Sequence, residues 1–146
     1  MRRSIMFGAL LLIVGFATAS AEETKRLAFV ERATTDAVTD TGVAGDSPGD
    51  LLTFANEIYD EKNETLAGTN NGWCIRTVAG KAWECFWTLT LKNGQIMVEG
   101  PFLDGQDSVV AITGGTGAYS EAKGEMALHA RNAQGTEYDF VYKLAN

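Results

Sequence analysis

Two polar side chains fall on faces of the chain that are otherwise apolar. Glu31 alternates with Leu27 and Phe29, so the three side chains share one face of an extended segment. Asn56 shares a face with the apolar residues of a second segment, Leu52, Phe54 and Ile58. A buried carboxylate is costly unless it is paired, hydrogen-bonded or protonated, and desolvation raises its pKa. We therefore predict Glu31 and Asn56 as the catalytic residues of an interior site. The alternative is a pair of strand ends that water reaches at the rim.

The two cysteines lie on either side of a short turn. A two-residue turn at 79–80 places Cys74 directly opposite Cys85 and Gly72 opposite Trp87. We predict a disulfide between the cysteines, as is common in exported proteins. The alternative is a pair of small buried side chains that are not bridged.

A second turn is predicted at the Asn-Gly pair at 93–94, because both residues tolerate the positive φ of a type I′ hairpin. This turn places Cys85 opposite Phe102 and Trp87 opposite Gly100. Trp87 would then lie between two glycines, with space left for its indole ring.

Alternation gathers apolar side chains on one face of these strands, and such a face must be covered by a core or by a ligand. The residues that we expect to line a ligand site are Leu52, Phe54, Cys74, Arg76, Trp83, Trp87 and Phe102. Arg76 is included because it shares a face with Cys74, from which its charge would oppose a rise in the Glu31 pKa. A filled core is the alternative.

The sequence carries no strong signal for phosphate or metal chemistry. The GGTG sequence at 114–117 lacks the lysine of a phosphate-binding loop and the third glycine of a dinucleotide-binding turn, so we predict a structural turn. His129 is the only histidine, and its alternation places it toward solvent. We expect no metal ion and no organic cofactor.

The beginning of the chain has the pattern of a secretory signal peptide. Arg2 and Arg3 precede an apolar run, and an Ala-Ser-Ala site follows at 19–21. We predict cleavage after Ala21, which leaves residues 22–146 as one secreted or periplasmic domain, without stable membrane association. The formal charge then moves from −7 to about −9, which argues against nucleic acid and anionic membranes as partners.

The mature chain consists of short β segments without a long helical period. The expected strands are residues 27–33, 51–59, 65–78, 81–92, 95–102, 108–113, 125–131 and 136–144. A long polar connection spans 34–50, and a glycine-rich turn spans 114–124. Eight strands with short turns are typical of an all-β barrel or sandwich.

Several segments resemble the allene oxide cyclase family: GDLLTFANEIYD, GWC, the run from 83 to 91, VEGPF and AITGGTGAY. GGTGAYSEAKG is more distantly similar to dirigent proteins. The resemblance implies an eight-stranded antiparallel barrel with an apolar pocket, often in a homotrimer. It also implies an activity without metal or cofactor, the cyclisation of an unsaturated fatty-acid epoxide to a cyclopentenone.

The resemblance also gives roles to individual residues. Glu31 matches the glutamate that stabilises developing positive charge, Asn56 the asparagine of the second strand, and Cys74 and Phe54 two pocket residues. This chain departs from the family at the tyrosine after Gly-Pro, which is Phe102 here. The strand-one asparagine is replaced by Ala33, and the proline and serine that help hold a water have no match in 34–40.

These observations predict an exported barrel that holds an apolar small molecule and, if it is an enzyme, steers a cyclisation or isomerisation. The alternative is a dirigent-like or lipocalin-like binder without catalysis. A third possibility is a structural module with a filled interior.

Overall fold

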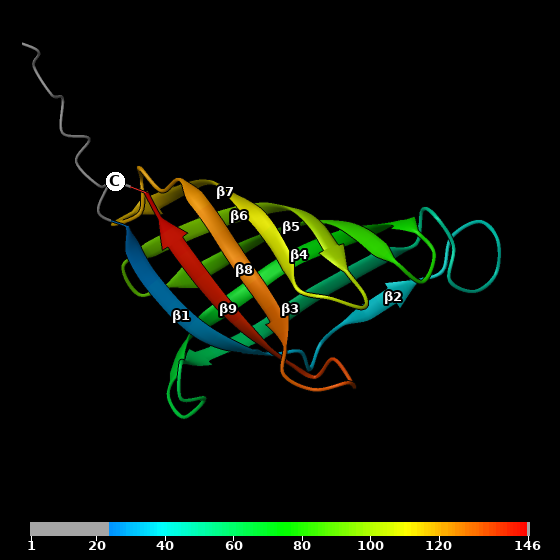
Figure 1. Cartoon of the computed structure of the whole chain (residues 1–146), viewed down its shortest axis with the longest axis horizontal. Coiled ribbons are helices and arrows are strands. Elements are labelled where there is room, and N and C mark those ends of the chain that lie inside the picture. Colours follow the sequence, from blue (N-terminus) through cyan, green and yellow to red (C-terminus); the bar gives the residue numbers. More distant parts are fainter. Residues whose placement is uncertain (1–23, 146) are drawn as a thin grey trace, which may run out of the picture.

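The computed structural model describes residues 24–145, and the predicted signal peptide lies outside them. The chain forms nine strands, β1 (Lys25–Arg32), β2 (Ala37–Thr39), β3 (Leu51–Asp60), β4 (Leu66–Val78), β5 (Ala82–Leu91), β6 (Gly94–Leu103), β7 (Ser108–Gly117), β8 (Gly124–Ala130) and β9 (Glu137–Leu144) (Figure 1). In the described part of the chain, no helix has the length and apolar character needed to cross a membrane.

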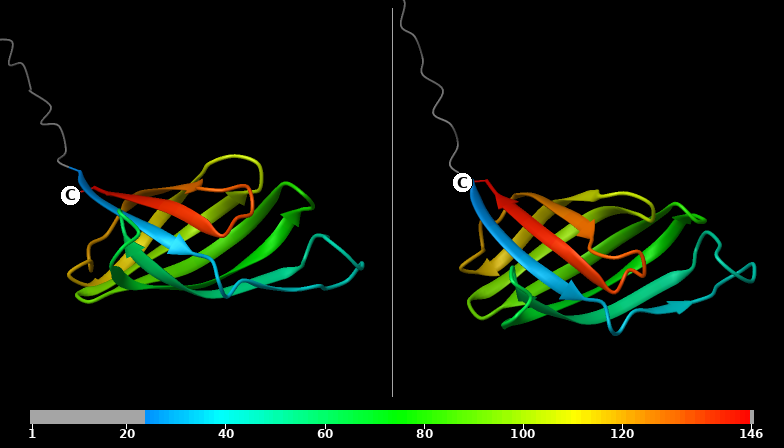
Figure 2. Two further views of the ribbon diagram at one scale, coloured as in Figure 1. Left: turned by 90° about the horizontal axis from the view of Figure 1, so that it is seen from below. Right: turned by 60° about the horizontal axis from the view of Figure 1, so that its bottom comes forward.

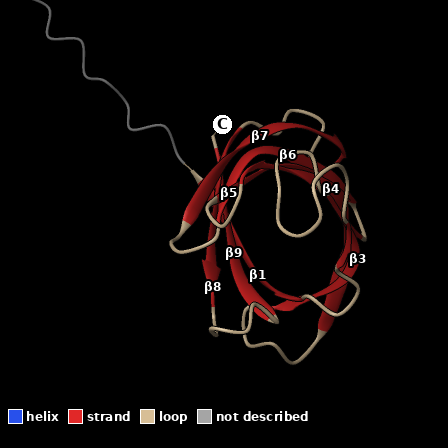
Figure 3. Cartoon of the chain, turned by 90° about the vertical axis from the view of Figure 1, so that its right-hand side faces the viewer, coloured by secondary structure: helices blue, strands red, loops and turns tan. Residues whose placement is uncertain are grey.

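Eight of the strands close into an antiparallel barrel, as predicted. Neighbours in sequence pair from β3 to β9, and β1 closes the ring by pairing with both β9 and β3 (Figures 2 and 3). The short β2, which the sequence analysis placed in a loop, pairs with the first residues of β3. Strands β1 and β2 therefore lie along successive parts of β3, separated by residues 33–36.

One end of the barrel is packed with apolar side chains. Alternate residues point inward, and many of these are fully or almost fully buried: Ile58, Leu89, Ile96, Val98, Val110, Ile112, Met126, Leu128, Phe140, Tyr142 and Leu144. Most of them come from the end of the barrel where β5 finishes and β6 begins. The alternative of a filled core therefore holds for this end, and an open space lies toward the other.

The first hairpin has the predicted register. Cys74 pairs with Cys85, and Gly72 pairs with Trp87. A Cβ atom at Gly72 would overlap the Phe86 carbonyl oxygen and the Cβ atom of Trp87, so the close approach of β5 to β4 requires this glycine. The register shifts between Arg76 and Val78, so Val78 pairs with Ala82 rather than Lys81.

The register predicted for the second hairpin is wrong by two residues. Leu91 pairs with Gly94, and Trp87 pairs with Val98 instead of Gly100. Gly94 is a strand residue with φ 151°, and a Cβ there would collide with the backbone of β7. The glycine is needed for the close approach of the next strand, not for the turn. A shift of two residues leaves every side chain on its predicted face.

The glycine-rich segment also differs from its prediction. Residues 114–117 continue β7, and the turn follows them. A Cβ at Gly115 would overlap the Tyr119 carbonyl, so the close approach of the returning chain requires this glycine. The segment has a structural role, although it is a strand end rather than the turn itself.

Candidate functional site

A narrow cavity opens toward the end of the barrel where β3 and β5 begin. It measures about 60 Å³. Its lining is mainly aromatic and aliphatic, with two carboxyl groups: Glu31, Asp36, Leu52, Phe54, Asn56, Cys74, Cys85, Trp87, Phe102, Leu128, Tyr138 and Phe140. We call this space the inner cavity. Ligand pockets usually measure about 300–1,000 Å³, so the inner cavity holds a few waters or one end of a ligand.

Glu31 lies inside the barrel, on the face that its alternation predicts. Its side chain is 5% exposed, and its Oε1 accepts a hydrogen bond from Asn70 Nδ2 at 3.2 Å. Burial raises the pKa of Glu31 to about 7, while the hydrogen bond from Asn70 acts in the opposite direction and the Asp36 carboxylate adds to the rise. Near neutral pH the side chain is therefore present both as an acid and as a base.

Asn56 is fully buried beside Glu31, but most of its hydrogen bonds hold the chain between β1 and β2. Its Oδ1 accepts from the backbone N–H groups of Thr34 and Thr35 at 3.1 and 3.0 Å, and from the Thr35 hydroxyl at 2.8 Å. Its Nδ2 donates to Asp36 at 2.7 Å. Asn56 thus positions the loop at 33–36 and, with it, the Asp36 carboxylate at the cavity.

Buried polar groups continue behind Glu31. Asn70 Oδ1, Trp87 Nε1 and the Tyr142 hydroxyl are buried, and none has a hydrogen-bond partner among the described residues. Burial raises the pKa of Tyr142. The interior around Glu31 therefore keeps unused hydrogen-bonding capacity.

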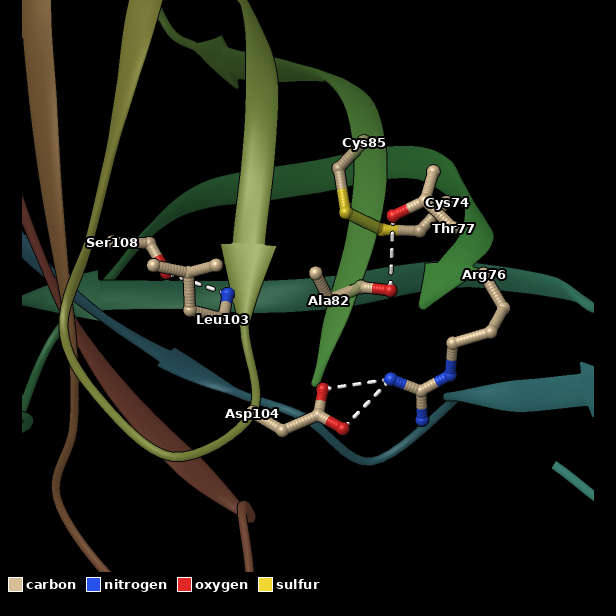
Figure 4. The surroundings of a disulfide bond; sticks show 8 residues. All are labelled: Cys74, Arg76, Thr77, Ala82, Cys85, Leu103, Asp104 and Ser108. Atoms are coloured by element: carbon tan, nitrogen blue, oxygen red, sulfur yellow. Dashed lines mark hydrogen bonds and ion pairs between the residues drawn. A yellow bond between two sulfur atoms is a disulfide. The ribbon is translucent and has the colours of Figure 1, made fainter. Parts of the chain in front are cut away.

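The predicted disulfide is present and forms part of the cavity wall. Cys74 and Cys85 join neighbouring strands β4 and β5, and both are 3% exposed (Figure 4). The described part of the chain has no free cysteine. Because the bridge lies beside Trp87 and Phe102, it contributes apolar surface as well as a covalent link.

Of the residues predicted to bind ligand, five line the inner cavity and two do not. Arg76 is buried, but its guanidinium donates to Asp46 at 2.6 Å. It also donates to Asp104 at 2.7 and 2.9 Å (Figure 4). It also stacks over the Trp83 ring at 3.9 Å. The expectation that Arg76 would oppose the pKa rise of Glu31 is wrong, because its charge is used by the two aspartates.

A larger groove adjoins the inner cavity on the outside. It measures about 330 Å³ and lies between the β6–β7 and β8–β9 connections. Phe102, Leu128 and Tyr138 line both spaces. His129 lies in this outer groove, exposed as predicted, with Nδ1 2.7 Å from Asp107. That hydrogen bond raises the pKa of His129.

Three residues of the site were not found from the sequence. Asn70 lies in a polar stretch without apolar alternation, and Asp36 lies in a loop. Tyr138 has the correct alternation on β9, but no motif distinguished it; burial and the carboxylates of Asp36, Glu31 and Asp104 raise its pKa. Among residues 24–145, no group of three or more histidine, cysteine or acidic side chains is arranged to hold a metal ion.

Comparison with known proteins agrees with this architecture. The sequence model of the family described as allene oxide cyclase matches residues 29–134. A pyocyanin demethylase structure is similar, with 23% identity and a TM-score of 0.70 over 81% of this chain and 100% of that one. The exo-specific intermolecular Diels-Alderase AbnU matches with 16% identity and a TM-score of 0.68, over 85% of this chain and 99% of its own. A pterocarpan synthase dirigent protein matches with 14% identity and a TM-score of 0.67, over 87% and 99%. At these identities the likeness shows the fold.

Proposed function

Since this chain belongs to the allene oxide cyclase family, we propose that its barrel binds a small molecule with a mainly apolar framework, with one end in the inner cavity and the remainder in the outer groove. We further propose that Glu31 assists a cyclisation or isomerisation of that molecule. The observation that carries the proposal is the position of Glu31, a buried carboxyl group with a pKa of about 7 at an aromatic cavity.

The chemistry follows from the two states of Glu31. The protonated acid can donate a hydrogen bond or a proton to an oxygen of the ligand, and the carboxylate can stabilise positive charge that develops on carbon. A pKa close to the working pH suits both roles. The narrow aromatic walls would restrict the ligand to few conformations, which lowers the entropic part of the barrier to ring closure.

A non-catalytic binder is the second candidate, and the geometry of Asn56 favours it. Because the amide is occupied by the loop at 33–36, it offers a ligand less than the sequence suggested. Glu31 would then be the principal polar group that faces a ligand.

Binding is tested with 1-methylnaphthalene, a compact neutral probe. The chain contains three tryptophans, so a ¹H–¹⁵N spectrum shows three indole signals, which Trp→Phe variants assign. We expect the probe to move the Trp87 signal saturably and to leave that of Trp73, which is on the outer face of β4 and 42% exposed, in place. A Trp87 signal that does not move, or a Trp73 signal that moves equally, would contradict the binding proposal.

Catalysis is tested with an unsaturated fatty-acid epoxide as the substrate. If Glu31 acts in the transition state, Glu31→Gln should abolish product formation and leave the Kd of the neutral probe within about tenfold of the wild-type value. Glu99→Gln, on the outer face of β6, is the matched control. Probe binding without turnover in the wild type would favour the binder.

Export and self-association are part of the same proposal. The disulfide supports a mature domain that folds in an oxidising compartment. The exposed apolar side chains of Trp73 and Ile75, which lie close together on the outer face of β4, support self-association, which we propose gives a homotrimer. N-terminal sequencing of the exported protein and light scattering test these two points.

A further inference from the structure

The walls of the inner cavity form a connected series of aromatic rings. Phe54 contacts Trp87 with ring centroids 6.2 Å apart, and Trp87 contacts Phe140 at 5.7 Å. Tyr138 continues the series at 6.5 Å from Phe140, and Phe102 follows at 6.0 Å from Tyr138. All five rings line the inner cavity. Aromatic rings carry negative charge on their faces, so a site walled by several of them attracts cations.

The charged groups at the inner cavity are acidic. Glu31 and Asp36 line it, and within residues 24–145 neither forms an ion pair. Arg76, the buried cation at this end of the barrel, is already shared by Asp46 and Asp104. Burial raises the pKa of Tyr138, which lines both the inner cavity and the outer groove, and the carboxylates of Asp36, Glu31 and Asp104 add to this rise.

We propose that the ligand of this barrel is a flat organic cation, with its charge on an alkylated ring nitrogen that lies among the aromatic rings next to Glu31 and Asp36. This inference rests on the proposed binding function and specifies its ligand class. A quaternary or ring nitrogen fits better than a primary ammonium, because a compact ammonium is strongly hydrated and loses more on entering an apolar slot. A flat ring can stack against the aromatic walls, and the small volume of the inner cavity favours a compact ring system.

Glu31 links cation binding to pH. It faces Asn70 on β4, Asn56 on β3, Asp36 in the following loop and, through the β1–β9 pairing, Tyr138. None of these groups neutralises it, so a bound cation would favour the carboxylate and release its proton. Because the pKa of Glu31 is about 7, cation affinity should rise by up to about tenfold between about pH 6 and pH 8.

The test compares two probes of the same shape. 1-Methylquinolinium carries a positive ring nitrogen where 1-methylnaphthalene has carbon. Equilibrium dialysis gives their Kd values, and the Trp87 indole signal confirms where they bind. We expect the cation to bind at least about tenfold more tightly at pH 8, with the preference reduced severalfold in Asp36→Asn. Glu99→Gln changes the charge equally at a distant site and should leave the preference unchanged.

His129 is the titrating group that must be separated from Glu31, since it lines the outer groove and the Asp107 carboxylate raises its pKa above the ordinary value of 6.5. The pH dependence of cation binding should disappear in Glu31→Gln and persist in His129→Asn; the reverse result would overturn the role given to Glu31. Equal or tighter binding of the neutral probe would overturn the cation inference and leave the proposed binding function intact. If neither probe moves the Trp87 signal, both proposals fail.

Discussion

Replacing Glu31 with glutamine measures how a carboxyl group inside the barrel changes the free energy of unfolding. Burial raises the pKa of Glu31 to about 7 from its ordinary value of 4.5. Between these pH values the folded protein keeps a proton that the unfolded chain releases, so stability falls as the pH rises. At about 1.4 kcal/mol per pH unit, the whole difference is worth roughly 3 kcal/mol. This stability is fully present below about pH 4.5 and is lost as the pH rises through about 7.

The glutamine variant has no proton to lose, so its stability should not follow this curve. We expect its free energy of unfolding, relative to wild type, to increase by roughly 3 kcal/mol between about pH 4.5 and pH 8. Urea unfolding followed by tryptophan fluorescence, without reductant so that the disulfide stays intact, gives this difference at each pH. Glu99→Gln should show a nearly constant difference. If the Glu31→Gln difference is also constant with pH, or decreases, the buried-carboxyl reasoning is refuted.

Three further predictions concern the groups around the site. Intact mass should show exported protein about 2 Da lighter than its reduced form, and replacing Cys74 and Cys85 by serine should cost up to about 3 kcal/mol by urea unfolding. Arg76→Lys should lower the free energy of unfolding by about 1–2 kcal/mol, because the paired hydrogen bonds of the guanidinium are lost. The Kd of the neutral probe should stay within twofold, or about 0.4 kcal/mol; a large change in Kd would place Arg76 in the binding site after all. Asn56→Leu should cost about 2 kcal/mol and speed amide hydrogen exchange in the loop at 33–36; unchanged exchange would show that the amide does not hold that loop.

The barrel could be predicted because alternation and turn residues act locally. The position of Cys74 opposite Cys85 depends only on one short hairpin, and it is correct. The predicted register of the second hairpin was wrong because Gly94 is needed for the close approach of β7, a strand that follows more than ten residues later. Local sequence rules identify a glycine that matters, but they do not show which neighbour needs it.

The residues of the candidate site likewise include some that local sequence rules could place and some that they could not. The inward position of Glu31 follows from alternation with its apolar neighbours, and the structure agrees. Asn70, which donates to Glu31, is 39 residues away in sequence, and the register of β3 with β4 brings it there. Arg76 was misplaced because its alternation is correct but its aspartate partners come from distant loops. Long-range pairing, rather than propensity, decides these contacts.

The closure of the barrel through β1 has a consequence for the timing of folding. Lys25 pairs with Leu144, so the first strand can dock on both of its neighbours only after the last strand has been synthesised. Contacts of such long sequence separation form slowly, because the entropy of a large loop must be lost first. Until then the ring is open and its edges are unpaired. The barrel of a nascent chain can therefore close only after its last strand has left the ribosome.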